Sequence, residues 1–213
     1  MQLNTSFIKP LYGYIGAFCL TLCVLTITNH ANALPVEIKN ASVSYTAIES
    51  IVLPDLNTDG IADIGVFYTD TIEDKLRLQV IDGASLNPSK LITWNNIYVA
   101  PTLHLFPDLN GNGVPEIGVF GMRTDNNNVG KPQIIVKDLM TGNNSTVYNW
   151  PANWTNVEAL ILADMNGDNT VEVAIQGRFK QGDRPQLVVK NGATSNNIAT
   201  YSYPNQLSDP KYF

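Results

Sequence analysis

Residues 53–67 read LPDLNTDGIADIGVF, an acidic loop followed at once by an apolar run. The same order of residues recurs in 106–120, FPDLNGNGVPEIGVF, and in 162–175, LADMNGDNTVEVAI. The first aspartates of the three copies, which are 53 and 56 residues apart, are Asp55, Asp108 and Asp164. Self-similarity at a nearly fixed spacing is typical of a protein built from copies of one supersecondary unit. The chain is therefore predicted to contain three such units.

The repeat extends beyond the acidic loop. Residues 76–82, LRLQVID, correspond to 132–138, PQIIVKD, and to 185–191, PQLVVKN. The second unit is three residues longer than the others, and the surplus falls in the turn 123–130, which contains an Asn-Asn-Asn run. Loops tolerate added length far better than strands do. An insertion confined to one turn therefore supports a true repeat.

Each unit contains four short apolar runs, which in the first unit are residues 51–53, 64–67, 78–81 and 91–94. These runs are rich in β-branched and aromatic residues, are bounded by turn-forming residues, and show no sustained apolar period of 3.6 residues. Four short strands in a unit of this length are typical of a β-propeller blade. We therefore expect an all-β fold, with three four-stranded, β-propeller-type repeats of about 53–56 residues within residues 34–213.

The acidic loops carry oxygen-bearing side chains at positions 1, 3, 5 and 9, counted from the first aspartate. These are Asp55, Asn57, Asp59 and Asp63 in the first loop, Asp108, Asn110, Asn112 and Glu116 in the second, and Asp164, Asn166, Asp168 and Glu172 in the third. Position 7 would add a backbone carbonyl, from Ile61, Val114 and Thr170 respectively. Ca²⁺ takes six to eight oxygen ligands, and alternate residues of a tightly turned loop can point theirs inward. The pattern predicts up to three Ca²⁺ sites, with the first loop the strongest because it combines three carboxylates with a glycine at position 6.

Two other interpretations of the loops are open. An EF-hand or dockerin-type loop has the same opening but needs a bidentate Glu at position 12 and a following helix; position 12 here is Val66, Val119 and Ile175. Metal-free turns also use Asp, Asn and Gly. Three carboxylates within nine residues repel one another without a cation, so three loops in one register favour calcium. Folding and calcium binding should then be coupled.

The first 33 residues have a different character. They contain one basic residue, Lys9, and no acidic one, with an apolar run over 11–27 and the sequence Ala-Asn-Ala at 31–33. This is the layout of a secretory signal peptide cleaved after Ala33. An uncleaved membrane anchor is the alternative, although the run falls just short of the roughly 18 apolar residues that a spanning helix needs. We expect a secreted, periplasmic or cell-surface protein that leaves the membrane after cleavage.

Composition excludes several function classes. With 19 acidic and 13 basic residues, a net charge of −6 and a sequence pI near 4.8, the chain has no positive field for nucleic acid or anionic lipid. Cleavage after residue 33 would remove both cysteines and leave His104 as the one histidine. Disulfides, Cys/His zinc sites and cysteine nucleophiles would then be absent. We expect His104 on a strand with its ring facing outward.

The pattern Asp-x-Asn-x-Asp-Gly-x-x-Asp followed by an apolar strand resembles the calcium loop of FG-GAP or VCBS-type repeats. Such repeats form the blades of the integrin alpha-chain propeller and occur in many secreted bacterial proteins. The resemblance covers nearly all of residues 42–213 and implies that loop oxygens at positions 1, 3, 5, 7 and 9 hold Ca²⁺. This chain departs from the pattern at Asn112, Glu116, Asn169 and Glu172.

The number of repeats bears on closure. A propeller ring typically needs four to eight blades, and the register would place a fourth acidic loop near residue 217, past Phe213. We expect an incomplete or truncated propeller. The alternatives are a ring closed by self-association and an open stack whose edge strands pair with other chains.

Two functions from different classes fit the sequence. The first is a non-catalytic, calcium-stiffened module for adhesion or for binding an extracellular protein or carbohydrate, with contacts on loops such as 124–130 and 143–145. The second is a hydrolase or lyase that acts on a polysaccharide or phosphoester. The absence of a nucleophile–base constellation favours the first, because the loop acids all belong to the repeat pattern. A third possibility is a non-functional fragment of a larger propeller protein.

Overall fold

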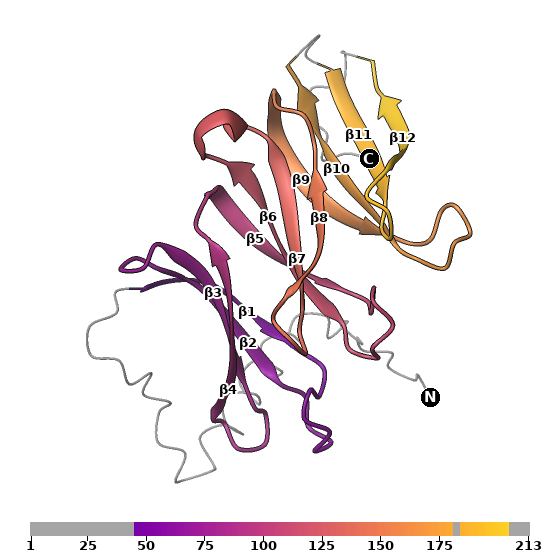
Figure 1. The fold of residues 1–213 in the computed structure, drawn as a ribbon. Helices are drawn as coiled ribbons and strands as arrows, with labels where there is room; N and C mark the ends of the chain where they lie inside the picture. The colour runs from indigo at the N-terminus through magenta and orange to yellow at the C-terminus, as the bar shows by residue number, and fades with distance from the viewer. Residues whose placement is uncertain (1–44, 181–183, 205–213) are drawn as a thin grey trace, which may run out of the picture. The chain divides into compact units, whose positions relative to one another are not determined.

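The chain folds into strands joined by turns (Figure 1). The computed structural model describes residues 45–180 and 184–204, which all belong to one compact unit that begins at Ala41. The expected signal peptide, residues 1–33, lies outside the described residues. Within the described part of the chain, no helix is long and apolar enough to cross a membrane.

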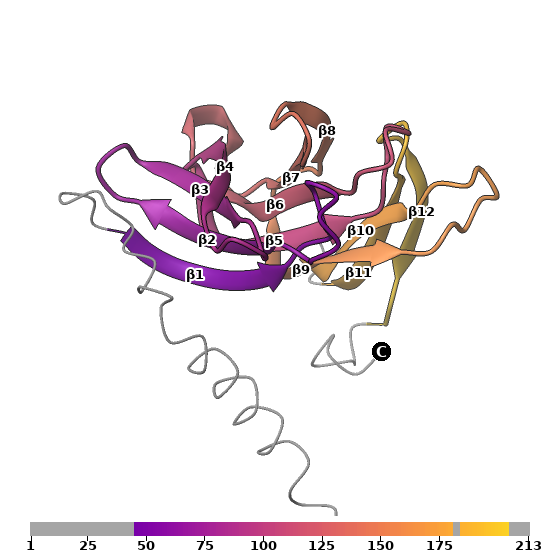
Figure 2. The ribbon, with the colours of Figure 1, turned by 90° about the horizontal axis from the view of Figure 1, so that it is seen from below.

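Twelve strands in the described residues form three four-stranded antiparallel sheets. The first sheet contains β1 (Tyr45–Val52), β2 (Ile64–Asp70), β3 (Lys75–Ile81) and β4 (Pro88–Asn95); the second contains β5 (Tyr98–Phe106), β6 (Glu116–Arg123), β7 (Pro132–Asp138) and β8 (Asn144–Asn149); the third contains β9 (Trp154–Leu162), β10 (Glu172–Phe179), β11 (Arg184–Asn191) and β12 (Asn197–Ser202). Each strand pairs with the next along the chain, so every sheet is a simple meander (Figures 1 and 2). The all-β prediction and the four strands per repeat are confirmed.

Burial along the strands follows the position of each sheet. In β3 the fully buried residues alternate with half-buried ones, which is the pattern of a sheet with one covered face. In β6 six consecutive residues are buried. The difference arises because the second sheet contributes residues to both apolar clusters of the molecule and is therefore covered on both faces.

The two apolar clusters join neighbouring sheets. One contains Phe67 and Trp94 of the first sheet with Leu103 and Val119 of the second. The other contains residues of the second sheet, together with Trp150 directly after β8, and residues of the third. Polar contacts cross the same boundaries, since the indole N–H of Trp94 donates to the carbonyl of Ile135 at 3.1 Å. The sheets thus pack face against face through their aromatic residues.

The extra residues of the second repeat lie where the sequence predicts them, in the β6–β7 connection, which includes a 3₁₀ turn over Asn126–Asn128. The three acidic loops are the β1–β2, β5–β6 and β9–β10 connections. The described residues show three sheets without a closed ring. The propeller-type assignment is therefore not shown, and the incomplete propeller stays a prediction.

Candidate metal centre

The aspartate at position 1 organises each acidic loop. In the third loop, Asp164 Oδ1 accepts the N–H groups of Asn166 at 3.1 Å and Gly167 at 2.6 Å, while Oδ2 accepts that of Asn169 at 2.8 Å. Asp55 and Asp108 accept equivalent N–H groups at 2.6–3.2 Å. These backbone hydrogen bonds, above all those from Gly60, Gly113 and Gly167, hold the pKa of the three carboxyl groups below the usual range.

Positive φ angles close the turn at two positions of each loop. Position 6 has φ of +89° at Gly60, +83° at Gly113 and +64° at Asn169, and the sequence predicts this from residue types that tolerate the conformation. Position 4 is also left-handed, with Thr58, Gly111 and Gly167 at +64°, +79° and +83°. Position 4 is outside the predicted set, although its two glycines, Gly111 and Gly167, are a sequence signal for this conformation.

Side chains at positions 3 and 5 cap the following backbone. Asn166 Oδ1 accepts the N–H of Asp168 at 2.9 Å, and Asp168 Oδ1 accepts that of Thr170 at 2.9 Å. The first and second loops repeat both contacts at 2.8–3.0 Å. These are Asx turns, which form with or without a cation. The turns place the predicted ligands on one loop but do not by themselves indicate a metal.

Position 9 separates the loops into two kinds. Asp63 is buried, and its two oxygens accept N–H groups from Leu56 at 3.2 Å and Gly83 at 3.1 Å. Glu116 and Glu172 are fully buried, and in each one only Oε2 accepts a backbone N–H, at 2.7 Å. Their Oε1 atoms have no hydrogen-bond partner. A buried carboxylate oxygen without a partner is costly, and a cation is one ligand that would offset that cost at either glutamate.

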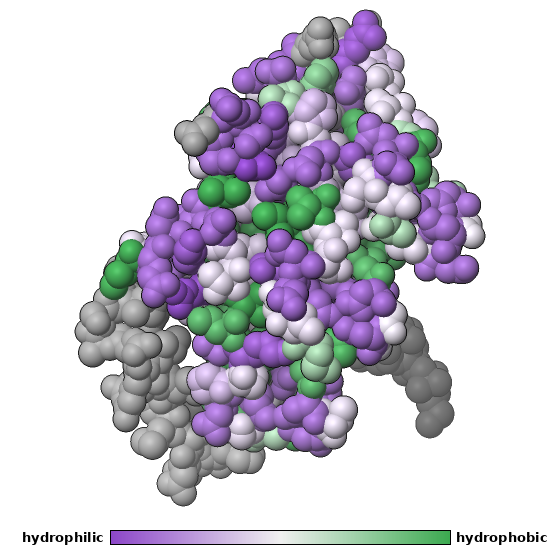
Figure 3. Space-filling model, in the orientation of Figure 1, coloured by the Kyte–Doolittle hydropathy of each residue, from purple (hydrophilic) through white to green (hydrophobic). Residues whose placement is uncertain are grey.

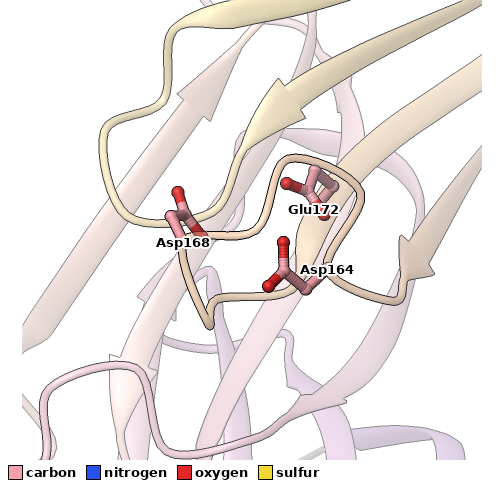
Figure 4. Close-up of side chains that lie close together, drawn as sticks. All are labelled: Asp164, Asp168 and Glu172. Atoms are coloured by element: carbon pink, nitrogen blue, oxygen red, sulfur yellow. The ribbon is translucent and has the colours of Figure 1, made fainter.

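The third loop brings its acids together. One carboxylate oxygen from each of Asp164, Asp168 and Glu172 lies within 4.8 Å of the other two. Figure 4 shows the three side chains around one short turn, with Glu172 on the buried side and the two aspartates, both exposed, facing it. Among the residues that the structure describes, no other three acids lie so close together.

The first loop differs from the third although it carries the same number of acids. Asp55, Asp59 and Asp63 are all described, and they do not converge in this way. The reason lies at position 9, where the shorter Asp63 has both oxygens engaged by backbone N–H groups. The predicted order, with the first loop strongest, stays a prediction that this geometry does not favour.

The second loop has two acids of its own, because position 5 is Asn112. Burial raises the pKa of Glu116, and the nearby negative charges of Asp108 and Asp138 raise it further. A bound cation would offset both causes. The loop therefore carries an excess of negative charge, which either a bound cation or a proton on Glu116 would relieve.

Three side chains outside the predicted set contact the loops. They begin the hairpin between the third and fourth strand of each sheet, and they are Asp82, Asp138 and Asn191. Asn57 Nδ2 donates to Asp82 Oδ2 at 2.5 Å, and Asn110 Nδ2 donates to Asp138 Oδ2 at 2.6 Å. The sequence signal was their common place in the repeat register, directly after the 76–81, 132–137 and 185–190 runs.

His104 lies on β5 as predicted, but its ring does not face outward. The ring is half-buried and meets Phe120 edge-on, with 6.3 Å between centroids, and Nε2 lies 3.0 Å from the hydroxyl of Thr102. The ring is only partly exposed because it packs against Phe120 of the neighbouring strand β6. Burial lowers the pKa of His104.

Comparison with models of known protein families, with curated proteins and with solved structures finds no match to this chain.

Proposed function

We propose that this protein is a calcium-binding β-repeat module of propeller type, which acts outside the cell by binding a protein or carbohydrate ligand without catalysis. The observation that carries the metal assignment is the carboxylate of Glu172, whose buried Oε1 has no hydrogen-bond partner and which offers an oxygen within 4.8 Å of oxygens of Asp164 and Asp168. In the second loop, the buried Oε1 of Glu116 likewise has no hydrogen-bond partner.

The donor set fits a hard cation. Each loop offers carboxylate and amide oxygens, and the described residues include no cysteine and one histidine, which lies outside the loops. Oxygen-only sets suit Ca²⁺ and Mg²⁺, whereas Zn²⁺ takes nitrogen and sulfur ligands as well. Ligands from aspartate, asparagine and glutamate side chains of one loop favour Ca²⁺, which accepts irregular geometry and longer bonds. The bound ion would supply positive charge that holds the loop carboxylates together.

The role proposed for the ion is stiffening. Each loop is joined to its own sheet by a buried position 9 residue, so neutralising the loop would stabilise the start of β2, β6 or β10. Ligand contacts would then come from turns at the surface, such as residues 124–130 and 143–145. On the face shown in Figure 3, hydrophilic residues dominate and apolar residues form small separate groups, a surface suited to a polar ligand.

Thermal unfolding followed by tryptophan fluorescence tests the proposal, with the whole chain measured in excess Ca²⁺ and in chelator. We expect a rise of several degrees in the Tm with Ca²⁺, since an ion that binds only the folded state stabilises it by mass action. Glu172→Gln should reduce this rise by removing one charged ligand. Glu158→Gln is the matched control, because Glu158 is an exposed glutamate on β9 that contacts Gln176.

Equal Tm values with Ca²⁺ and with chelator would refute the metal assignment and leave the loops as Asx turns. An equal calcium-dependent rise in wild type and Glu172→Gln would show that the ion binds elsewhere.

A further inference from the structure

The residue that begins the hairpin between the third and fourth strand of each sheet contacts the acidic loop of the same sheet. In the second sheet, Asp138 is 5% exposed, and its Oδ2 accepts the side-chain Nδ2 groups of Asn110 at 2.6 Å and Asn112 at 2.5 Å. Both asparagines are predicted metal ligands, at positions 3 and 5. A side chain 26 residues beyond Asn112 is therefore part of the loop's polar network.

In the third sheet the same contact has the opposite arrangement of charge. Asn191, also 5% exposed, donates from Nδ2 to Oδ2 of Asp168 at position 5. The second sheet thus has Asn at position 5 and Asp in the hairpin, whereas the third has Asp at position 5 and Asn in the hairpin. Each network holds three carboxylates: Asp108, Glu116 and Asp138 in the second, and Asp164, Asp168 and Glu172 in the third.

A separate observation points to a ligand in the second network. Glu116 is fully buried, and its Oε1 has no hydrogen-bond partner. Glu116 lies against the same network, because its Oε2 accepts the N–H of Leu109, the residue after Asp108, at 2.7 Å, and Glu116 pairs with Asp138 across β6 and β7. The second network thus shares with the third its number of carboxylates and a buried glutamate oxygen without a partner, although only the acids of the third lie within 4.8 Å of one another.

We propose that Asp138 completes the second calcium site by supplying the carboxylate that Asn112 lacks. The inference rests on the proposed function. Asp138 acts in two ways: its charge raises the attraction for the ion, and its bonds to the two amide nitrogens fix which end of each amide is an oxygen directed into the loop. Because ligand charge tunes calcium affinity, the second and third sites should bind with similar strength.

Calcium titration calorimetry of the whole chain tests this, with the number of sites and the Kd values compared between variants. Asp138→Asn should weaken one site by about 10- to 100-fold, as loss of an outer partner of a metal site does. The double variant Asn112→Asp with Asp138→Asn copies the third sheet and should restore the affinity. In the third sheet, Asp168→Asn with Asn191→Asp copies the second and should keep its affinity, while Asp168→Asn alone should lose it.

The outcomes separate this inference from the proposed function. Calcium binding by the wild type with no change in Asp138→Asn would overturn the role of Asp138 and leave the calcium module intact. A double variant as weak as Asp138→Asn would also overturn it, because the charge could then not be exchanged between the two positions. A wild type that binds no calcium would overturn both. If Asp138→Asn does not fold, the two double variants decide, since each retains all three carboxylates.

Discussion

At the scale of single residues, the choice between Asp and Glu at position 9 decides what a loop can hold. Asp63 reaches two backbone N–H groups and is satisfied without a cation. Glu116 and Glu172 are one methylene longer. Each accepts one backbone N–H and has a second carboxylate oxygen without a hydrogen-bond partner. Glu at position 9 departs from the Asp of the first loop. This replacement is the feature that most favours a metal.

Substitutions at position 9 should therefore affect the calcium-dependent part of stability differently in the first and third loops. Asp63→Asn should disturb the first loop through lost backbone hydrogen bonds, and its cost should persist in chelator because those bonds do not involve the ion. Glu172→Gln should cost little in chelator and more in calcium. The check is the free energy of unfolding by denaturant under both conditions, and a Glu172→Gln cost independent of calcium would contradict this assignment.

His104 gives a pH dependence that a single substitution isolates. Burial lowers its pKa below the ordinary value of 6.5, so below about that pH the unfolded chain takes up a proton before the folded chain does. Stability should then fall as the pH drops below 6.5, and the contribution is fully present above it. In His104→Gln this part of the slope should disappear. The measurement is denaturant unfolding between pH 7.5 and 5.5 in saturating Ca²⁺; parallel curves for both proteins would contradict the prediction.

At the scale of elements, the hairpin between the third and fourth strand packs closely on the acidic loop. A Cβ on Gly192 would lie 1.9 Å from the carbonyl oxygen of Val171, and one on Gly83 would lie 2.0 Å from that of Ala62. In the second sheet the corresponding residue is Leu139, which is fully buried. The first and third hairpins therefore approach their loops through a glycine, and the second by a different arrangement.

Gly192→Ala should push the third hairpin away from its loop. The neighbouring atom belongs to the backbone, so the clash cannot be relieved by a side-chain rotation, and we expect a cost of about 1–3 kcal/mol, as for other overpacked sites. Gly142→Asn is the control, because that position has φ of +75° and open space around a Cβ, and Asn tolerates such an angle. Denaturant unfolding gives both values; equal costs would refute the close approach.

At the scale of the whole described unit, equivalent tryptophans join neighbouring sheets. Trp94 and Trp150 are both 2% exposed, and each has a lysine ammonium of the following sheet near its ring, Lys137 at 5.9 Å and Lys190 at 5.6 Å. They differ in the indole N–H, which donates to Ile135 from Trp94 and has no partner in Trp150. The two contacts between neighbouring sheets thus have similar packing around the tryptophan, but only Trp94 also forms a hydrogen bond through its indole N–H.

Trp94→Phe should therefore cost more than Trp150→Phe. Both substitutions remove similar apolar contacts, but the first also breaks a hydrogen bond, which is worth about 0.5–1.5 kcal/mol net. The comparison is made by denaturant unfolding of the two variants followed by circular dichroism, since each lacks a fluorescent reporter that the other keeps. A greater cost for Trp150→Phe would show that the indole N–H does not decide the difference.

Much of this architecture follows from local sequence. Short apolar runs bounded by turn residues predict twelve strands, and the constant offsets from Asp55, Asp108 and Asp164 predict which loops match. These features are local because strand alternation and Asx turns depend on residues one to five apart. The signal peptide and the identity of the cation remain predictions of the same kind, without a test in the described residues.

The tertiary structure decided what lies around those loops. The pairing of Glu116 with Asp138 across β6 and β7 brings a hairpin residue to a loop that precedes it by more than 20 residues, and sequence offsets within the loop could not show this. How the sheet covers the glutamate at position 9 decides that this side chain is buried and that one of its oxygens has no hydrogen-bond partner. Local chemistry thus determines the shape of the loop. Long-range packing decides which charges surround it and which glutamate oxygen has no partner, because only a folded sheet removes water from these carboxylates.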